Sequence, residues 1–550
     1  MTTDLPPALS ALLKEQGADA ARVLLIPAAL SDGRWWSARE LVRSTGVAHR
    51  VVAATLDALG DELERDGDRV RPRDPSRYAP LAERPRLADP VGHLLAPHAA
   101  AEAELERLVA GAPAARADLD HVAASARTAL RRAVFLGARF DLDGARLLCV
   151  GDHDLTSLAL TLVHPGAEAV VVDIDERMLA YIDAAADRLG LKVRCHFADL
   201  RLGLPPAVRS GSDLVFTDPP YTPEGVELFV RRGLEGLAEP RTARVLVAYG
   251  ASETTPALAA RTQERLTRLN LAVEAIWPDF NHYLGAEAIG AASDLYVLRA
   301  TARTPVGDGG GRAGSRSRAA ARIYSQGVNA RESADALTAG TAPLVWAGTA
   351  PDAFVGAWPE AALPEGANRV PLAAWLSAPV PAGHAVVDLT AGGEALTERV
   401  LLAAPAAELS VVVGSRAPQV RDEAGQAALR RVAGPDRTVR FARGVPDPRR
   451  TVVRVGAAAP GPGVADDAGA WLARHVRERA HGSVAAALRE GLIRAAAGLG
   501  APVNKKWART RVAAAAPWLS GHTLMDLPLH RLLELDAVAS RLAGELPGAH

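Results

Sequence analysis

The strongest constraint on the fold is a series of short apolar runs between residues 145 and 250, each followed at once by polar residues. The first four runs cover 146–150, 169–172, 193–197 and 213–217, and helical stretches separate them. This alternation is typical of a parallel sheet covered by helices. Ligands bind outside the carboxyl ends of the strands in such sheets. The residues directly after each run are therefore the first candidates for a binding site.

The length of the chain predicts several domains, because 550 residues are too many for a single hydrophobic core. We predict an α/β protein with a Rossmann-type (class I methyltransferase-like) parallel sheet. The predicted divisions are a winged-helix-like domain at 1–80, a helical connector at 81–130, the Rossmann-type catalytic domain at 131–301, a flexible linker at 302–320 and a C-terminal α/β and helical region of unknown role at 321–550.

Acidic residues follow the second and third runs, where a nucleoside would bind. An acid at the end of the second strand can accept two hydrogen bonds from ribose hydroxyls, and Asp173 has this position. Asp199 follows the third run and is a candidate partner for an adenine amino group. Gly151 and Asp175 complete the predicted cofactor-binding residues.

The fourth run ends in the tetrapeptide Asp-Pro-Pro-Tyr at 218–221. Consecutive prolines lack backbone donors and stiffen the turn, so their carbonyls and the Asp218 carboxylate can accept hydrogen bonds from a substrate amine. An aromatic ring beside them can contact a cation or a flat base. The predicted substrate-binding residues are Pro219, Pro220, Tyr221 and Glu224.

The first loop is acidic at the place where methyltransferases meet the methionine moiety of S-adenosylmethionine with a Gly-rich loop. Gly151 is followed by Asp152, His153 and Asp154. Two carboxylates would repel the α-carboxylate of S-adenosylmethionine and attract an ammonium group. Decarboxylated S-adenosylmethionine lacks that carboxylate and ends in an amine. The loop therefore favours the decarboxylated co-substrate, and the nearby acids suit a polycationic acceptor such as a polyamine.

Three motifs together resemble the branched-chain polyamine synthases, the N4-bis(aminopropyl)spermidine synthase family. They are Gly-Asp-His-Asp-Leu-Thr-Ser at 151–157, Val-Val-Asp-Ile-Asp-Glu at 171–176 and Thr-Asp-Pro-Pro-Tyr-Thr-Pro-Glu-Gly at 217–225. Pro-Asp-Phe-Asn-His-Tyr at 278–283 also fits the family, and the resemblance covers about residues 20–300. It implies a winged-helix-like region before a Rossmann catalytic domain. The family's first loop is Gly-Asp-Asp-Asp, so His153 replaces its middle acid.

The resemblance implies an aminopropyltransferase that uses decarboxylated S-adenosylmethionine and a polyamine amine such as that of spermidine. In the family, an aspartate of the first loop helps to deprotonate the attacking amine. We therefore expect Asp154 or Asp152 to be the base, Asp218 to hold the amine and Tyr249 to assist. No metal is expected, since three histidines do not form a convincing ligand set: His153, His164 and His196.

Two other functions stay open. Asp-Pro-Pro-Tyr also occurs in methyltransferases that act on adenine, guanine or glutamine nitrogen, so the first alternative is N-methyl transfer to nucleic acid or protein amines. The second is a winged-helix regulator with a Rossmann-like sensor domain, because residues 8–80 have the pattern of helices followed by a hairpin. The helix predicted at 48–63 carries His49 and Arg50 and then mainly acids. We therefore predict packing or dimer contact there, and no sequence-specific DNA binding.

Composition narrows the class of protein. With a formal net charge of −1, the chain has no overall electrostatic attraction to nucleic acid or anionic lipid. Cys149 and Cys195 are too few for a disulfide framework. The sequence has no signal-peptide pattern and no apolar run of about 20 residues. We expect a cytoplasmic protein without membrane contact, and a homodimer is an open possibility.

The C-terminal region repeats the pattern of strand, turn and helix. Residues 385–393 form an apolar run that ends in Asp388 and a Gly turn, and a second run follows at 408–414. Ser415 and Arg416 stand where a ribose-binding acid would be expected. We predict a second α/β unit that binds no nucleotide cofactor, followed by mostly helical residues at 466–550.

Overall fold

The computed structural model describes residues 5–84, 89–251, 255–305, 323, 342–346, 351–356, 358–405, 408–458 and 461–547. The chain divides into two compact units. The first comprises Met1–Val172, Tyr181–Val193 and Val208–Ala330, and the second comprises Asp173–Ala180, Arg194–Ala207 and Arg331–His550. Two short stretches of the predicted Rossmann-type domain therefore group with the C-terminal half of the chain.

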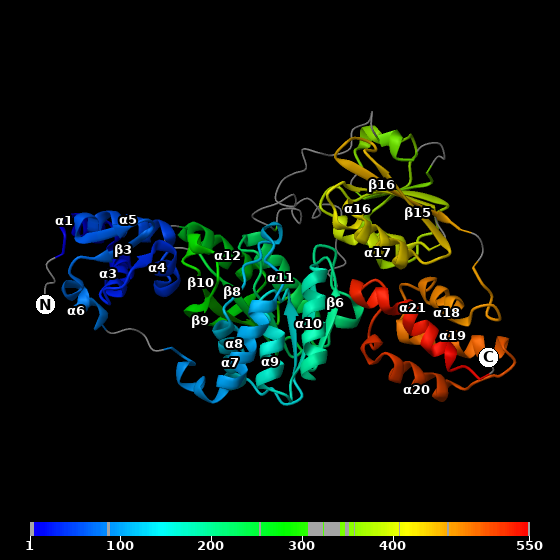
Figure 1. The fold of residues 1–550 in the computed structure, drawn as a ribbon, viewed down its shortest axis with the longest axis horizontal. Coiled ribbons are helices and arrows are strands. Elements are labelled where there is room, and N and C mark those ends of the chain that lie inside the picture. The colour runs from blue at the N-terminus through cyan, green and yellow to red at the C-terminus, as the bar shows by residue number, and fades with distance from the viewer. Residues whose placement is uncertain are drawn as a thin grey trace. The chain divides into compact units, whose positions relative to one another are not determined.

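A seven-stranded sheet with the order β6-β5-β4-β7-β8-β10-β9 organises the predicted Rossmann-type domain (Figure 1). The central strand β4 pairs in parallel with β5 and β7, and β7 pairs in parallel with β8. Strand β10 runs antiparallel to both β8 and β9. The predicted α/β Rossmann-type class is thus confirmed. The strands are β4 (Arg146–Val150), β5 (Glu168–Asp173), β6 (Val193–Phe197), β7 (Leu214–Thr217), β8 (Arg244–Tyr249), β9 (Leu271–His282) and β10 (Ala292–Ala300).

Helices α9 (Thr156–Val163), α10 (Glu176–Leu189) and α11 (Pro223–Gly236) connect the parallel strands. Helices α7 (Ala99–Gly111) and α8 (Ala126–Arg139) precede β4, and α12 (Pro256–Arg268) follows β8. The chain steps outward from β4 in two directions, and right-handed crossovers then place the connecting helices on opposite faces of the sheet. Helix α9 contacts β4 and packs with α7 and α8, whereas α11 contacts β4, β7 and β8 and packs with α12. Helix α8 runs across the boundary predicted at residue 130.

Local sequence determines the conformation of the loops that follow β4 and β7. Gly151 follows β4 with a φ of 73°, a left-handed conformation that glycine adopts without steric cost. Helix α11 begins at Pro223, and the side chain of its N-cap residue, Thr222, accepts a hydrogen bond from the backbone of Gly225. Both loops therefore turn at the carboxyl ends of neighbouring strands.

The N-terminal part has the predicted sequence of helices followed by a hairpin. Its bounds are α1 (Pro7–Gln16), α2 (Ala20–Val23), α3 (Leu25–Leu30), β1 (Trp36–Ser37), α4 (Ala38–Thr45), α5 (His49–Leu59), β2 (Leu63–Asp66), β3 (Arg69–Pro72) and α6 (Ala79–Ala82). A capping box of Ser37 and Glu40 opens α4. The helix predicted at 48–63 ends earlier, because Gly60 closes α5 and Leu63 begins β2. The winged-helix-like assignment stays a prediction.

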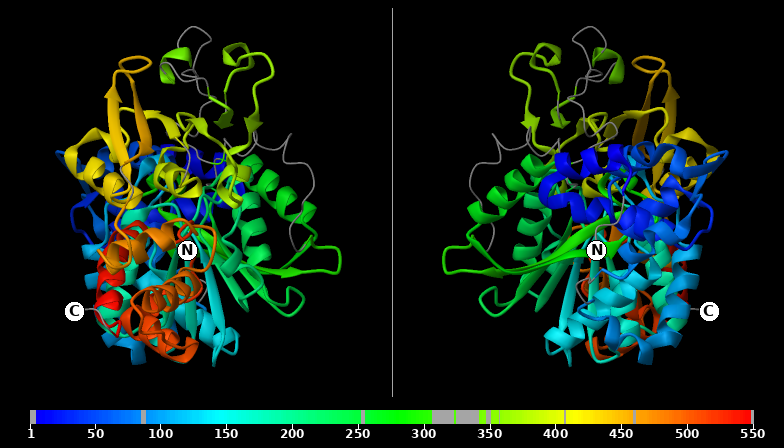
Figure 2. Two further views of the ribbon diagram at one scale, coloured as in Figure 1. Left: turned by 90° about the vertical axis from the view of Figure 1, so that its right-hand side faces the viewer. Right: turned by 90° about the vertical axis from the view of Figure 1, so that its left-hand side faces the viewer.

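The second unit contains a six-stranded sheet with the order β12-β11-β13-β14-β16-β15. Its strands belong to the part of the chain that is coloured from light green through yellow to orange in Figure 2. β11, β12, β13 and β14 are parallel, whereas β16 runs antiparallel to β14 and β15. Its strands are β11 (Ala353–Gly356), β12 (Arg369–Val370), β13 (His384–Asp388), β14 (Glu408–Gly414), β15 (Arg437–Arg443) and β16 (Arg450–Ala457). The sequence predicts this second α/β unit correctly.

Helices of this unit flank the second sheet and then form a separate helical core. Their bounds are α14 (Leu372–Ser377), α15 (Thr397–Ala403), α16 (Pro418–Arg421), α17 (Glu423–Ala433), α18 (Ala468–Arg477), α19 (Val484–Gly498), α20 (Lys505–Ala515) and α21 (Leu529–Gly544). The prediction of mostly helical structure at 466–550 is confirmed.

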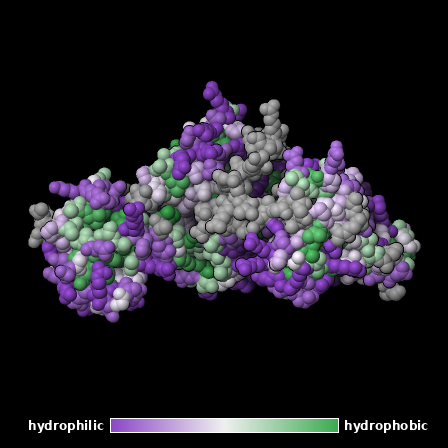
Figure 3. All heavy atoms as spheres, turned by 90° about the horizontal axis from the view of Figure 1, so that it is seen from above, coloured by the Kyte–Doolittle hydropathy of each residue, from purple (hydrophilic) through white to green (hydrophobic). Residues whose placement is uncertain are grey.

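The face drawn in Figure 3 mixes hydrophilic and apolar side chains. Large exposed apolar residues include Val273 and Ile276 on the edge strand β9. None of the helices in the described residues is long and apolar enough to cross a bilayer. The predicted cytoplasmic location stays a prediction, and the predicted linker lies outside the described residues from 306 onward.

Candidate active site

A buried arginine joins the loops that follow β4 and β7. The Arg132 side chain comes from α8 and is 0% exposed. Its Nη1 donates to Asp154 Oδ2 at 2.8 Å, and its Nη2 donates to Asp218 Oδ2 at 2.6 Å. Its Nε donates to Asn281 Oδ1 at 2.8 Å. One fixed cation therefore holds two acids, and we call Arg132, Asp154 and Asp218 the acid–arginine cluster.

Asp218 is the most accessible member of the cluster. Its side chain is 16% exposed, compared with 6% for Asp154. The Tyr283 hydroxyl donates to Asp218 Oδ2 at 2.7 Å, and the Tyr221 hydroxyl donates to Oδ1 at 3.1 Å. Both carboxylate oxygens are thus oriented by donors. Asp218 is therefore the acid of the cluster that a ligand can best reach.

The two tyrosines form a chain of hydroxyl groups behind Asp218. The Tyr221 and Tyr283 oxygens are 2.8 Å apart, and Tyr283 lies 2.7 Å from Ser293 Oγ. Burial and the charge of Asp218 raise the pKa of both tyrosines well above its usual value. Both phenols therefore stay protonated and can act as hydrogen-bond donors.

The surroundings of the cluster shift the pKa values of its two acids in opposite directions. Burial and then the charge of Asp154 raise the pKa of Asp218 to about 8, although Arg132 and Tyr283 oppose this rise. Burial also favours the neutral form of Asp154, but the Arg132 guanidinium outweighs it and lowers the pKa of that carboxyl. Asp154 is then the permanent anion, while Asp218 titrates near the pH at which a general base works best.

The first loop directs its acids toward backbone amides. Asp152 accepts from the amides of Thr156 at 2.8 Å and Ser157 at 3.1 Å, where the first turn of α9 exposes N–H groups. Burial raises the pKa of Asp152 to about 7. Asp154 Oδ1 accepts from the Ala124 amide at 2.8 Å. Both carboxylates thus already accept hydrogen bonds from the protein, and Arg132 also pairs with Asp154. Their expected role toward an incoming cation stays a prediction.

The remaining predicted substrate residues have partners of their own. Glu224 forms an ion pair with Arg265 at 2.9 Å. The Tyr249 hydroxyl accepts from Thr262 at 3.0 Å, and its ring meets the Tyr221 ring edge-on at 5.5 Å. Tyr249 therefore borders the site through its ring.

The two prolines after Asp218 are buried. The carbonyl of Pro220 accepts from the Thr222 amide at 2.8 Å, within the turn that leads into α11. This turn holds Pro219 and Pro220 in place beside Asp218. A carbonyl oxygen has two lone pairs, so the expected contact of these carbonyls with a substrate amine stays a prediction.

The predicted nucleoside-binding acids belong to the second unit. Asp173 Oδ1 accepts from the Asp175 amide at 2.8 Å. Asp175 pairs with Arg177 at 2.6 Å, and Asp199 pairs with Arg201 at 2.5 Å. Each of these two arginines lies two positions after its acid, so the local negative charge is smaller than a count of acids indicates.

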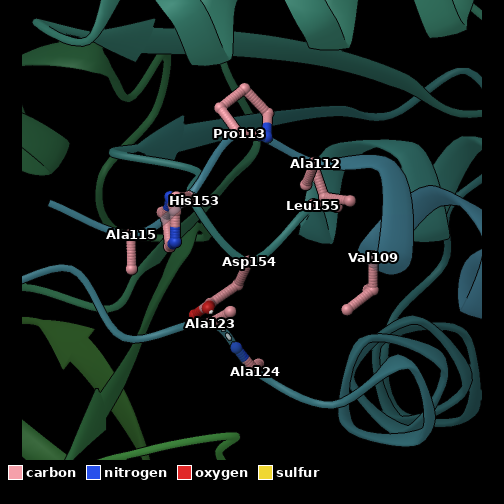
Figure 4. Close-up of a pocket in the computed structure, with 10 residues that line it drawn as sticks. Val109, Ala112, Pro113, Ala115, Ala123, Ala124, His153, Asp154 and Leu155 are labelled. Atoms are coloured by element: carbon pink, nitrogen blue, oxygen red, sulfur yellow. Dashed lines mark hydrogen bonds between the residues drawn. The ribbon is translucent and has the colours of Figure 1, made fainter.

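A small cavity lies beside the first loop (Figure 4). His153 stacks on His121 with ring centroids 4.5 Å apart, and the polar lining of the cavity comes from His153 and Asp154. The volume is about 140 Å³, and the other lining residues are Val109, Ala112, Pro113, Ala114, Ala115, Ala123, Ala124 and Leu155. A polar site of this size can hold water, and its apolar wall also suits a short methylene chain.

Four contributors to the site were not assigned roles from sequence: Arg132, Asn281, Tyr283 and Ser293. Asn281 and Tyr283 belong to the motif at 278–283, so the polar residues of that motif are a usable signal. Arg132 gives no such signal, because a single arginine in a helix before the first strand is most often exposed.

The mostly parallel sheet and the glycine turn after β4 define a class I, Rossmann-type domain with acids at its strand ends. Residues 102–305 match the family model described as the branched-chain polyamine synthase A C-terminal domain. This segment is therefore similar to the branched-chain polyamine synthases, the family that the sequence motifs resemble.

Curated relatives match the same part of the chain. An uncharacterized protein of Methanocaldococcus jannaschii is 35% identical over 33% of this chain and 45% of its own length. The N(4)-bis(aminopropyl)spermidine synthase of that organism is 30% identical over 32% of this chain and 51% of its length. The enzyme of that name from Thermus thermophilus is 37% identical over 24% of this chain and 39% of its length. This chain thus spans about half, or less, of these relatives.

Among solved structures, the branched-chain polyamine synthase of Thermus thermophilus is similar with a TM-score of 0.41 and 22% identity. The match covers 55% of this chain and 95% of that one. That structure holds N4-aminopropylspermidine and 5'-methylthioadenosine.

Proposed function

We propose that the chain transfers the aminopropyl group of decarboxylated S-adenosylmethionine to an amine of a polyamine such as spermidine. The observation that carries this proposal is the acid–arginine cluster within the segment that matches the branched-chain polyamine synthase family model. Relatives named N(4)-bis(aminopropyl)spermidine synthase supply the substrate class.

The reaction is an in-line displacement. The acceptor nitrogen attacks the methylene carbon bonded to the sulfonium, a new C–N bond forms, and the C–S bond breaks. The electron pair of that bond goes to sulfur, so neutral methylthioadenosine leaves. The acceptor amine must lose a proton, because amines are protonated at neutral pH.

Asp218 is our candidate for the group that takes this proton. It is the accessible acid of the cluster, and its pKa of about 8 lies near the working pH. This proposal replaces the assignment of the base to Asp154 or Asp152, since those carboxylates accept backbone hydrogen bonds. Asp154 then keeps Arg132 charged and in place.

The cavity at the first loop is our candidate for the aliphatic part of the acceptor. Its wall is mainly alanine, valine and leucine, while Asp154 and His153 provide the polar edge. A polyamine alternates methylene segments with amines, so this mixture of surfaces fits a short segment of it. Asp173 and Asp199 are proposed for the ribose and the adenine amino group.

N-methyl transfer from S-adenosylmethionine is the second candidate, and one observation favours it. Arg132 offsets the charge of the acids that would repel the α-carboxylate of S-adenosylmethionine. The electrostatic argument for the decarboxylated form is therefore weaker than the sequence indicates.

Product analysis separates the two candidates. The full chain is incubated with spermidine and either S-adenosylmethionine or its decarboxylated form, and the products are identified by mass spectrometry. Aminopropylated spermidine with the decarboxylated form is the expected result. A methylated product with the carboxylated form would establish the second candidate and reject the first.

A further inference from the structure

We propose that His196, His522 and Asp526 form a binding site for a divalent transition-metal ion of the zinc type. The site lies in the second unit, between the end of β6 and the segment that precedes α21. It is distinct from the acid–arginine cluster and takes no part in the proposed transfer step. The sequence predicts no metal because the histidines of the Rossmann-type region form no ligand set among themselves, whereas Asp526 lies 330 positions after His196.

The three side chains converge on one point. His196 Nδ1 lies 3.1 Å from Asp526 Oδ1, and His522 Nδ1 lies 2.9 Å from the same oxygen. All three candidate ligand atoms lie within 4.8 Å of one another. Zinc bonds to nitrogen and oxygen are about 2.0–2.2 Å long, so the ligand atoms of a tetrahedral ion lie roughly 3–3.5 Å apart. The side chains therefore need little movement to surround an ion.

The surrounding groups orient the carboxylate. The amide and hydroxyl of Thr523 donate to Asp526 Oδ2 at 3.2 and 2.6 Å, so Oδ1 is the oxygen directed toward the imidazoles. The Phe197 amide donates to the Asp526 carbonyl at 2.7 Å and fixes the backbone beside β6. Hydrogen bonds of this kind typically orient metal-ligating carboxylates.

The imidazole rings are arranged so that both present Nδ1 to the same place. They are stacked with centroids 4.1 Å apart and an interplanar angle of 29°. The three residues are only 3–4% exposed. Buried imidazole nitrogens with one carboxylate suit zinc and similar transition metals, whereas magnesium and calcium prefer oxygen ligands. A fourth position at the ion would be taken by water.

The competing interpretation is a hydrogen-bonded clasp. In the clasp, both imidazoles carry their proton on Nδ1 and donate it to Asp526. In the metal site, both Nδ1 lone pairs bind the ion, and the proton of each neutral ring is on Nε2. The clasp therefore binds no ion and carries protons on both Nδ1 atoms, whereas the metal site binds one ion per chain through both Nδ1 atoms.

The test uses the full chain, freed of metal with a chelator and titrated with Zn²⁺ by calorimetry. We expect one ion per chain, and an affinity lower by at least about a hundredfold in Asp526→Asn, because a charged ligand is lost. His384→Gln is the matched control, since His384 is a buried histidine of the same unit that bonds to Ser410. It should leave zinc affinity unchanged, and Mg²⁺ should not compete.

A measurement on the unaltered chain covers the case in which Asp526→Asn fails to fold. X-ray absorption of the Co²⁺- or Zn²⁺-loaded chain should show two imidazole nitrogens and no sulfur ligand. A folded chain that takes up no ion, a sulfur ligand from the buried cysteines, or equal affinity in folded Asp526→Asn would each overturn the proposal.

Discussion

The two α/β sheets of this chain place an aspartate at the end of a central parallel strand, but the two aspartates have different surroundings. Asp218 follows β7 and bonds to Arg132, Tyr221 and Tyr283. Asp388 ends β13 and accepts from the amide of Thr390 at 2.9 Å and from its hydroxyl at 2.7 Å. The first acid is thus oriented by two groups from other elements as well as by Tyr221 of its own turn, and the second by its own turn alone.

This difference shows why a strand-end acid alone does not make an active site. Burial raises the pKa of both carboxyls. Only Asp218 combines a raised pKa with partial exposure of 16%, since Asp388 is buried. An acid that satisfies its own turn stabilises the loop, whereas an acid held by distant groups can also face a substrate.

The sharpest test of the comparison removes one charge in each sheet. Asp218→Asn keeps the shape of the side chain and should lower turnover about a hundred- to ten-thousandfold, since general-base assistance has this size. Asp388→Asn should change turnover little. Product formation from decarboxylated S-adenosylmethionine and spermidine is measured for both, with methylthioadenosine binding as a check on folding. Equal losses in both variants would remove the distinction between the sheets.

The buried arginines extend the comparison to stability. Arg132→Met leaves Asp154 and Asp218 without their cation and should lower the free energy of unfolding by about 3–5 kcal/mol. Arg399→Met in the second unit should cost less, because its partner Glu176 is 22% exposed and can be hydrated. Urea denaturation followed by circular dichroism measures both. A larger loss of unfolding free energy in Arg399→Met than in Arg132→Met would contradict the prediction that Arg132 contributes more to stability.

The next largest effect is expected on cofactor affinity, at Asp173, the residue proposed to bind the ribose. Asp173→Ala removes the proposed acceptor for the ribose hydroxyls, and loss of a hydrogen bond to a charged group costs roughly 1.5–3 kcal/mol, or about ten- to a hundredfold in affinity. Calorimetric titration with methylthioadenosine measures this change. An unaltered dissociation constant in a folded variant would reject the assignment of Asp173.

The pH dependence follows from the raised pKa of Asp218. The base must be deprotonated to act, so kcat/KM should rise with pH and level off above the pKa of about 8. Between pH 7 and pH 9 the deprotonated fraction increases roughly tenfold. This rise should be absent from the residual activity of Asp218→Asn. A flat profile for the unaltered chain would assign the base to another group.

The smallest effect is expected at Tyr249. Its hydroxyl bonds to Thr262 and contacts the site only through its ring, so Tyr249→Phe should change turnover by less than about threefold, because a neutral hydrogen bond outside the reacting groups contributes little. Tyr221→Phe removes a donor to Asp218 and should have a clearly larger effect. Equal effects would restore the assisting role that the sequence predicts for the Tyr249 hydroxyl.

The sequence by itself determines the class of fold and the identity of the strand-end acids. The spacing of the apolar runs requires parallel strands with helical crossovers, and Thr222 and Pro223 begin a helix through local chemistry alone. Such features depend on residues a few positions apart. These features can therefore be predicted without knowledge of the packing.

Only the tertiary structure decides which of these acids can react. Arg132 precedes Asp218 by 86 positions and Tyr283 follows it by 65, so their contacts with Asp218 arise only when α8 and the end of β9 pack beside β7. The same packing brings Arg132 and the Ala124 amide to Asp154, and the arginine offsets negative charge that the motif alone implies. The hydrogen bonds of Asp152, in contrast, are local, to amides four and five positions after it. Proton affinity depends on burial and on nearby charges. These are set by residues that are distant in the chain, and a strand-end motif does not contain them.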